Sequence, residues 1–133
     1  MALVVLDASV VIGFLDPEDT LHESCVRAFS AHHDDDFRLP ASAYAEILVA
    51  PHRAGADAVA AIEAFLTDLV IKVEPITKAV AGKAAALRAG YKNLRLPDAL
   101  VLAAADDLAA DAVLTGDVSW AKISPRVTVV RGR

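Results

Sequence analysis

The stretch that decides the fold is "ALVVLDASVVIGFL", residues 2–15. Residues 2–6 form a short, uninterrupted apolar run that ends at Asp7, and such runs are typical of strands buried in a parallel sheet. The next eight residues, 8–15, are also mostly apolar and predict a short helix that ends before Pro17. A strand that leads directly into a helix is the repeating unit of α/β proteins.

The rest of the chain continues this alternation. Strands are predicted at residues 37–39, 70–75, 112–115 and 127–130, and helices at residues 20–32, 41–50, 56–69, 77–88 and 97–110. Pro51 and Gly55 are expected to separate two of these helices. The order predicts an α/β fold with a mainly parallel sheet that helices cover on both faces.

Length and composition predict a single domain that spans residues 1–133. The chain has 133 residues, of which 56% are hydrophobic, and this is enough apolar material for one core. The surplus of apolar residues suggests that part of the surface contacts another protein. Because no apolar run is long enough to cross a membrane and no signal peptide is evident, we expect a cytoplasmic protein.

The net charge of −5 argues against a general polyanion binder, although the basic residues are unevenly distributed. Residues 75–97 contain five basic residues and no acid: Lys78, Lys83, Arg88, Lys92 and Arg95. Lys92 and Arg95 stand nearest to Asp98, so they are candidates for contacts with a phosphate-bearing substrate. The alternatives are a solvated helix face for the strip and a surface ion pair for Arg95.

Three aspartates occupy positions where open parallel sheets build their sites, at the carboxyl ends of strands. Asp7 follows the first strand, Asp117 follows the strand at 112–115, and Asp98 begins a helix after Pro97. Each also has a structural interpretation. Asp7 suits a helix N-cap, Asp117 a Gly-Asp turn, and Asp98 the positive end of a helix dipole.

Two hydroxyl residues accompany these acids. Ser9 lies two residues after Asp7 and either caps the same helix or holds the carboxylate by a hydrogen bond. Thr115 lies two residues before Asp117 and is expected to be its hydroxyl neighbour.

Glu46 is the only charged residue in "ASAYAEILVA", residues 41–50. A carboxylate in such apolar surroundings needs a partner, because otherwise its pKa rises and it becomes neutral. No cation stands on the neighbouring helical turns. The partner is therefore either a remote basic residue or a metal ion.

The four acids, taken together, predict a cation site. Carboxylates from four separate segments that meet at one sheet edge repel one another unless a cation is present. Oxygen-only ligands favour Mg²⁺ or Mn²⁺ over zinc. Such an ion lowers the pKa of water and offsets charge in the transition state, which suits phosphodiester hydrolysis.

Four stretches of the sequence resemble the acidic motifs of PIN-domain nucleases, in particular the VapC toxins of bacterial toxin-antitoxin pairs. They are "VVLDASVVIGFL", the segment around Glu46, "RLPDALVLAAA" and "AVLTGDVSW". The resemblance covers nearly the whole chain. It implies a three-layer α/β/α sandwich, an endoribonuclease that depends on Mg²⁺ or Mn²⁺, and a homodimer inhibited by a cognate antitoxin protein.

The resemblance also implies roles for individual residues. Asp7, Asp98 and Asp117 would be the chief metal-binding acids, and Glu46 would act through water or as a base. The auxiliary hydroxyls would be Ser9 and Thr115, and the candidate RNA contacts are Lys92 and Arg95. Ala8 stands where many relatives have a polar residue, which is the one departure in these motifs.

Two other classes of protein stay open as alternatives. An aspartate-based phosphotransfer domain also places an acid after its first strand, but haloacid-dehalogenase-like enzymes need a second Asp where this chain has Ser9. The other alternative is a catalytically idle PIN-like module that only binds a partner. The chain has no glycine-rich phosphate loop, which argues against a P-loop nucleotide hydrolase.

Two further residues have both a structural and a functional interpretation. Cys25 falls at helical spacing with Leu21 and Phe29, which indicates a core residue rather than a metal ligand. Trp120 either stacks on a base of a bound nucleic acid or packs in the core.

Overall fold

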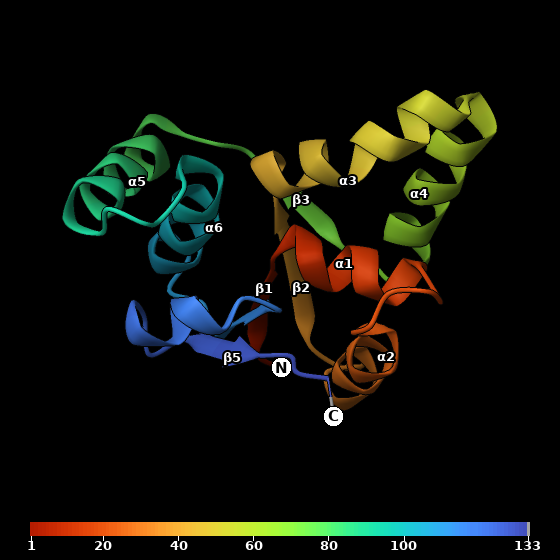
Figure 1. Cartoon of the computed structure of the whole chain (residues 1–133), viewed down its shortest axis with the longest axis horizontal. Helices are drawn as coiled ribbons and strands as arrows, with labels where there is room; N and C mark the ends of the chain where they lie inside the picture. Colours follow the sequence, from red (N-terminus) through yellow and green to blue (C-terminus); the bar gives the residue numbers. More distant parts are fainter. Residues whose placement is uncertain (133) are drawn as a thin grey trace.

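The computed structural model describes residues 1–132, which contain a five-stranded parallel sheet in the order β3-β2-β1-β4-β5 (Figure 1). The strands are β1 (Leu3–Leu6), β2 (Asp36–Pro40), β3 (Lys72–Glu74), β4 (Ala112–Thr115) and β5 (Val127–Val129). The helices are α1 (Ala8–Leu15), α2 (His22–Ala31), α3 (Ala41–Ala54), α4 (Ala56–Asp68), α5 (Lys78–Gly90), α6 (Leu96–Asp107) and the 3₁₀ helix η1 (Val118–Lys122). Among the helices of residues 1–132, none is long and apolar enough to cross a membrane.

The helices cover both faces of the sheet. The chain moves from β1 to β2 and β3 in one direction and then crosses to β4 and β5 on the other side of β1. Right-handed crossovers therefore place α1 to α4 on one face and α5 and α6 on the opposite face. Figure 1 shows α5 and α6 to the left of β1 and β2, and α4 to the right. The predicted α/β/α sandwich with a parallel sheet is confirmed.

The burial of β1 agrees with this layering. Val4, Val5 and Leu6 are all fully buried, although successive side chains of a strand point to opposite faces of the sheet. Only a strand covered on both sides has this pattern, which explains why "LVVL" reads as a continuous apolar run.

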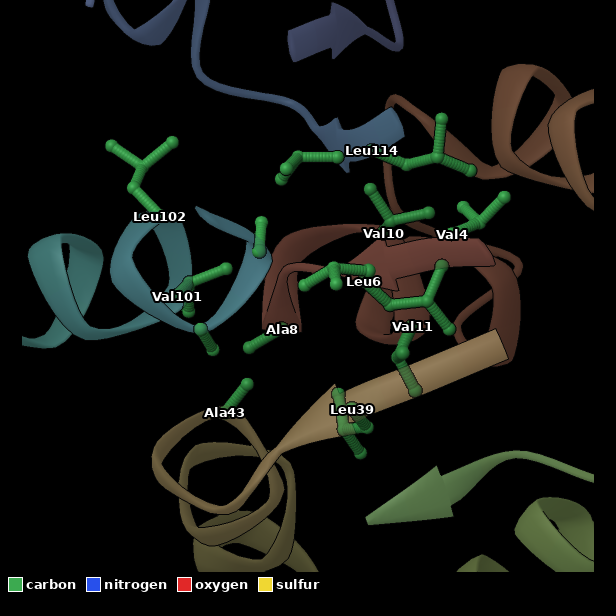
Figure 2. Close-up of a cluster of buried hydrophobic side chains, with 14 of the residues drawn as sticks. Val4, Leu6, Ala8, Val10, Val11, Leu39, Ala43, Val101, Leu102 and Leu114 are labelled. Carbon is green, nitrogen blue, oxygen red and sulfur yellow. The ribbon is translucent and has the colours of Figure 1, made fainter. Parts of the chain in front are cut away.

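Small and apolar side chains bring three helices together at the carboxyl edge of the sheet. Ala8 of α1, Ala43 of α3 and Val101 of α6 are buried, and Figure 2 shows them gathered beside Leu6 of β1. Ala8 and Ala43 add little volume between the helices, so α1 and α3 approach closely at this point. This junction brings Asp7 at the start of α1, Glu46 of α3 and Asp98 at the start of α6 near one another.

Helix α3 continues past the proline that was expected to end it. Pro51 lies in the last turn, and the helix ends at Ala54. A proline there loses only one backbone hydrogen bond, which a helix of this length tolerates. Gly55 ends the helix instead, with a φ of 133° that residues with a side chain rarely adopt.

Helix α6 is shorter than predicted and ends at Asp107 rather than near residue 110. Ala109 adopts a left-handed conformation with a φ of 50°, and the Ala110 N–H donates to the Ala105 carbonyl at 2.9 Å. This is a Schellman-type end, whose left-handed position is normally occupied by glycine. The usual sequence signal for the end of a helix is therefore missing here.

Cys25 and Trp120 are core residues, since both side chains are buried. The structural interpretation of Cys25 is confirmed, and burial raises the pKa of its thiol to about 11. At neutral pH the thiol is therefore protonated and a poor nucleophile or metal ligand.

Replacing Gly13 by alanine is expected to lower the free energy of unfolding by about 1–3 kcal/mol, because it overpacks the contact between α1 and α2. A Cβ atom at Gly13 would lie 2.7 Å from the Sγ atom of Cys25. Urea denaturation measures the change.

The matched control is Gly82→Ala in α5, where a Cβ atom meets nothing within 4 Å. That change should stabilise the protein by about 0.5–1 kcal/mol, because alanine has a higher helix propensity than glycine. Equal gains from the two substitutions would show that the α1–α2 contact is not tight.

Candidate active site

A cleft of about 430 Å³ lies at the carboxyl edge of the sheet, and all four predicted acids line it. Asp7 comes from the end of β1, Glu46 from α3, Asp98 from the first turn of α6, and Asp117 from the loop after β4. The cleft is completed by Ala8, Ser9, Ile12, Arg95 and Trp120. The fold thus brings together acids that are up to 110 positions apart in the sequence (117 − 7).

Asp7 is the most deeply placed acid, and only 7% of its surface is exposed. It is the N-cap of α1, and its Oδ1 accepts a hydrogen bond from the Ala8 N–H at 2.9 Å. Its Oδ2 accepts from the hydroxyls of Ser9 at 2.7 Å and Thr115 at 2.9 Å. The carboxylate is therefore held in one orientation by three donors.

Burial raises the pKa of Asp7 above its ordinary value, and the negative charge of Asp98 adds to the rise. The hydrogen bonds from Ser9, Thr115 and Ala8 oppose it because they favour the ionised form. Since desolvation outweighs these bonds, a cation in the cleft would stabilise the ionised carboxylate.

Ser9 and Thr115 connect the loop after β4 to helix α1. The Ser9 Oγ accepts from the Gly116 N–H at 3.0 Å, and the Thr115 Oγ1 accepts from the Asp117 N–H at 3.1 Å. Each hydroxyl thus donates its proton to Asp7 and accepts one backbone N–H. This arrangement fixes the loop that carries Asp117.

Replacing Thr115 by valine is expected to cost about 1–3 kcal/mol of unfolding free energy, because it leaves buried polar groups without partners. Valine has nearly the same shape as threonine but cannot donate to Asp7 or accept from Asp117. Thr115 is fully buried. The measurement is urea denaturation, with the exposed Thr128→Val on β5 as the matched control, which should be nearly neutral. Equal values for both variants would contradict the role given to the Thr115 hydroxyl.

Asp98 is paired with a cation from the adjacent loop. Its Oδ2 lies 3.4 Å from the Arg95 Nε, with 15% of the Asp98 side chain and 72% of the Arg95 side chain exposed. The surface ion pair proposed as the alternative role of Arg95 is therefore present. An exposed pair of this kind contributes about 0–1 kcal/mol, so Arg95 can leave Asp98 at little cost to contact a phosphate.

The expectation that Glu46 lies in apolar surroundings is wrong, because its side chain is exposed at the cleft. The apolar residues of α3 that reach the core, Ala43 and Ile47, are one turn apart, and Glu46 lies at the edge of their face, where it is exposed. The many alanines of this helix hide that pattern, since alanine is found both inside and outside proteins.

The pKa of Glu46 is nevertheless raised. Partial desolvation by the cleft walls is the main cause, followed by the negative charges of Asp7 and Asp98, while the charge of Arg95 lowers it. The sequence left open which basic residue, if any, lies near Glu46. In the structure this residue is Arg95. At Glu46, the repulsion from Asp7 and Asp98 exceeds the attraction of Arg95.

Asp117 faces the cleft from the start of η1 and is exposed. Its Oδ1 accepts from the Ser119 N–H at 2.9 Å and from the Ser119 hydroxyl at 2.6 Å. Asp117 is therefore the N-cap of η1, and its second oxygen has no hydrogen bond to another residue among those described. Lys92 does not line the acid cleft and lies in a neighbouring hollow instead.

Sequence reasoning missed two residues that shape the site, Gly116 and Ser119. A Cβ atom on Gly116 would lie 2.6 Å from Leu21 and 3.5 Å from the Ser9 Oγ, so a larger residue here would displace the Leu21 side chain. Ser119 fixes the Asp117 carboxylate. The run "GDVS" carries the signal, since an aspartate followed two residues later by serine is typical of a capped turn.

The donor set of the cleft suits a hard divalent cation. It offers four carboxylates and one guanidinium, and burial together with the charges of neighbouring acids raises the pKa values of Asp7 and Glu46. Oxygen ligands and net negative charge are what Mg²⁺ and Mn²⁺ prefer. Within residues 1–132, no three His, Cys, Asp or Glu side chains are arranged tightly enough to hold an ion as they stand. An ion would therefore have to draw these carboxylates closer together.

Comparison with solved structures shows the same fold in several bacterial proteins. A toxin-antitoxin complex from Klebsiella pneumoniae has a TM-score of 0.80 and 20% identity, with 98% of this chain and 99% of that chain covered. VapC20 from Mycobacterium tuberculosis, described as a sarcin-ricin loop cleaving toxin, has a TM-score of 0.76 and 17% identity, with 91% and 95% covered. FitAcB from Neisseria gonorrhoeae has a TM-score of 0.73 and 20% identity, with 97% of both chains covered.

Sequence comparison gives two results. No curated protein matches the chain at a significant level. The model of the PIN domain family matches residues 4–124, which include the strand before Asp7 and the turn that carries Asp117. Since this match spans most of the sequence, the chain belongs to the PIN domain family.

Proposed function

We propose that this protein is a metal-dependent endoribonuclease that acts as the toxin of a toxin-antitoxin pair. The observation that carries the proposal is the convergence of Asp7, Glu46, Asp98 and Asp117, from four separate segments, on one cleft. Membership of the PIN domain family supports it. So does the fold shared with VapC20, which is described as a toxin that cleaves the sarcin-ricin loop.

The aspartates would hold the ion, which we propose to be Mg²⁺ or Mn²⁺. Asp7 is oriented by Ser9 and Thr115, Asp98 by the start of α6, and Asp117 by its cap on η1. When bound, the ion would lower the pKa of an attacking water and offset negative charge at the phosphodiester. The protein contributes the arrangement of oxygens around that position.

Glu46 and Arg95 would complete the site from its exposed side. Because the pKa of Glu46 is raised, its carboxylate is a better proton acceptor than an ordinary glutamate and suits a general base. Arg95 is exposed and only weakly bound to Asp98, so its guanidinium can contact the phosphate. Both side chains can move when RNA enters.

The partners follow from the same proposal. Structural neighbours solved as toxin-antitoxin complexes support a cognate antitoxin protein as the inhibitor. We further propose that residues 1–133 act as one domain, that the protein forms a homodimer, and that it cleaves RNA in the cytoplasm.

The two alternative functions differ in what they require of the cleft. A phosphotransfer domain of the haloacid-dehalogenase kind needs a second aspartate two residues after the first, and this chain has Ser9 at that position. This observation disfavours phosphotransfer. A catalytically idle module would have no need for the four acids, and only an activity assay distinguishes it from a nuclease.

Incubating the purified protein with total cellular RNA tests the proposal. Mg²⁺ or Mn²⁺ should produce discrete fragments, and chelation by EDTA should abolish them, because the acids alone supply no Lewis acid. Mapping the fragment ends identifies the RNA and the cleaved sequence. Intact RNA under all three conditions would favour the idle module, and cleavage in EDTA would contradict the metal-dependent reaction.

A further inference from the structure

A second hollow, of about 230 Å³, lies next to the acid cleft. It is lined by the loop between α5 and α6 and by η1, through Tyr91, Lys92, Asn93, Ser119 and Lys122. Two chain segments join the two sites. Leu94 lines the hollow and the next residue, Arg95, lines the cleft, while Ser119 lines the hollow and the next residue, Trp120, lines the cleft.

The two sites have opposite charge. The hollow contains two lysines and no acid, whereas the cleft contains four acids and one arginine. Neither Lys92 nor Lys122 takes part in an ion pair among residues 1–132. An RNA strand that leaves a cation-filled cleft would therefore meet two free ammonium groups, which attract its next phosphates.

The hollow also offers groups that recognise a nucleobase. Tyr91 is 39% exposed, so its ring is available for stacking. The Asn93 side chain is exposed and has no hydrogen-bond partner in the described part of the chain, so its amide is free to donate and accept. The Ser119 hydroxyl donates to Asp117 and keeps lone pairs that can accept a hydrogen bond.

We propose that this hollow binds the base and phosphate of one RNA nucleotide next to the cleaved bond. The inference rests on the proposed function and adds to it a subsite that would influence which sequence is cut. The volume suits a single base, since sites for drug-sized ligands span roughly 300–1,000 Å³. Tyr91 stacks on the base, Asn93 contacts its edge, and Lys92 and Lys122 neutralise the phosphates. Ser119 contacts both this subsite and Asp117, so occupancy of the hollow is linked to the position of a catalytic acid.

The test measures RNA binding by fluorescence anisotropy in EDTA and 50 mM salt, so that no cleavage occurs. The probes are fluorescein-labelled ten-nucleotide RNAs of uridine, cytidine or adenosine. Tyr91→Ala should weaken binding of at least one of them by about 10-fold, while Tyr91→Phe, which keeps the ring, should bind as the wild type does.

Lys122→Ala should reduce the slope of log affinity against log salt by about 0.7, the value for one phosphate contact. Lys78→Ala, at the far end of α5, is the matched control and should change neither quantity.

Cleavage assays with Mg²⁺ or Mn²⁺ separate this inference from the proposed function. If the wild type cuts RNA and Tyr91→Ala cuts at the same positions with the same KM, the subsite is wrong and the nuclease stands. If Tyr91 and Lys122 are needed for binding but nothing is cut, the subsite stands and the nuclease is wrong. A wild-type protein that neither binds nor cuts RNA overturns both.

Discussion

Asp98→Asn is expected to reduce RNA cleavage by at least about 100-fold, since even side chains that only orient metal ligands contribute roughly 10–100-fold. The fold should be nearly unaffected. The variant loses an exposed ion pair with Arg95 and a charge at the start of α6, each worth about 0–1 kcal/mol. It also removes the repulsion that Asp98 exerts on Asp7 and Glu46. Cleavage rates and urea denaturation together measure both effects.

The matched control is Asp107→Asn, an exposed acid near the end of the same helix. It should retain full activity and stability. A large loss of stability in Asp98→Asn would show that Asp98 is chiefly a structural residue. If Asp98→Asn cleaved RNA at the wild-type rate, Asp98 would not be part of the catalytic site.

The pH dependence of stability tests the position of Asp7, whose pKa is raised mainly by burial and further by the charge of Asp98. Asp7 has a pKa raised above its ordinary value of 3.8, so the folded protein binds a proton more tightly than the unfolded chain does. Below the ordinary value, Asp7 is protonated in both states and does not affect stability. As pH rises from that value through the raised pKa, Asp7 increasingly destabilises the metal-free fold relative to the unfolded chain. The free energy of unfolding of Asp98→Asn minus that of the wild type should therefore be larger at neutral pH than at acidic pH, because Asp98 repels Asp7 only when both are ionised. A constant difference across pH would indicate that the acids do not interact.

Trp120→Ala is expected to lower the free energy of unfolding by about 3–5 kcal/mol, the usual cost of deleting a large buried aromatic side chain. Such a loss is a large part of the roughly 5–15 kcal/mol that stabilises a domain. Only 1% of Trp120 is exposed, and its indole forms part of the wall of the acid cleft. Urea denaturation of the metal-free protein measures the change.

This prediction tests the core role that burial assigns to Trp120. A core residue tolerates Trp120→Phe with a smaller loss, because phenylalanine fills most of the same space. If Trp120→Ala instead left stability unchanged and weakened only RNA binding, the indole would be a stacking platform rather than a core residue.

The sequence was sufficient for the alternation of strands and helices and for the four acids of the cleft. Buried strands of a parallel sheet leave a continuous apolar run, so "LVVL" and "AVLT" identified β1 and β4, and these strands are neighbours in the sheet. The chain reverses its direction across the sheet after β3, so β1 and β4 lie on either side of the switch point at which sites form. Asp7 and Asp117 could thus be placed at one edge from the pattern alone.

The sequence was insufficient where the determining contact is long-range. Ala109 takes a conformation normally left to glycine, so the end of α6 had no local signal. Alanine has no clear preference for the surface or the core, so the exposed side of α3 that carries Glu46 could not be distinguished from its buried side. The Asp7 network depends on Thr115, 108 positions away, which only the pairing of β1 with β4 brings close.

Isothermal titration calorimetry of the metal-free protein with Mn²⁺ tests most directly whether the clustered acids form a cation site. We expect saturable uptake by the wild type, a loss of that uptake in Asp98→Asn, and normal uptake in Asp107→Asn. If the wild type shows no uptake, or if the two variants bind Mn²⁺ equally well, the four carboxylates are not a metal centre.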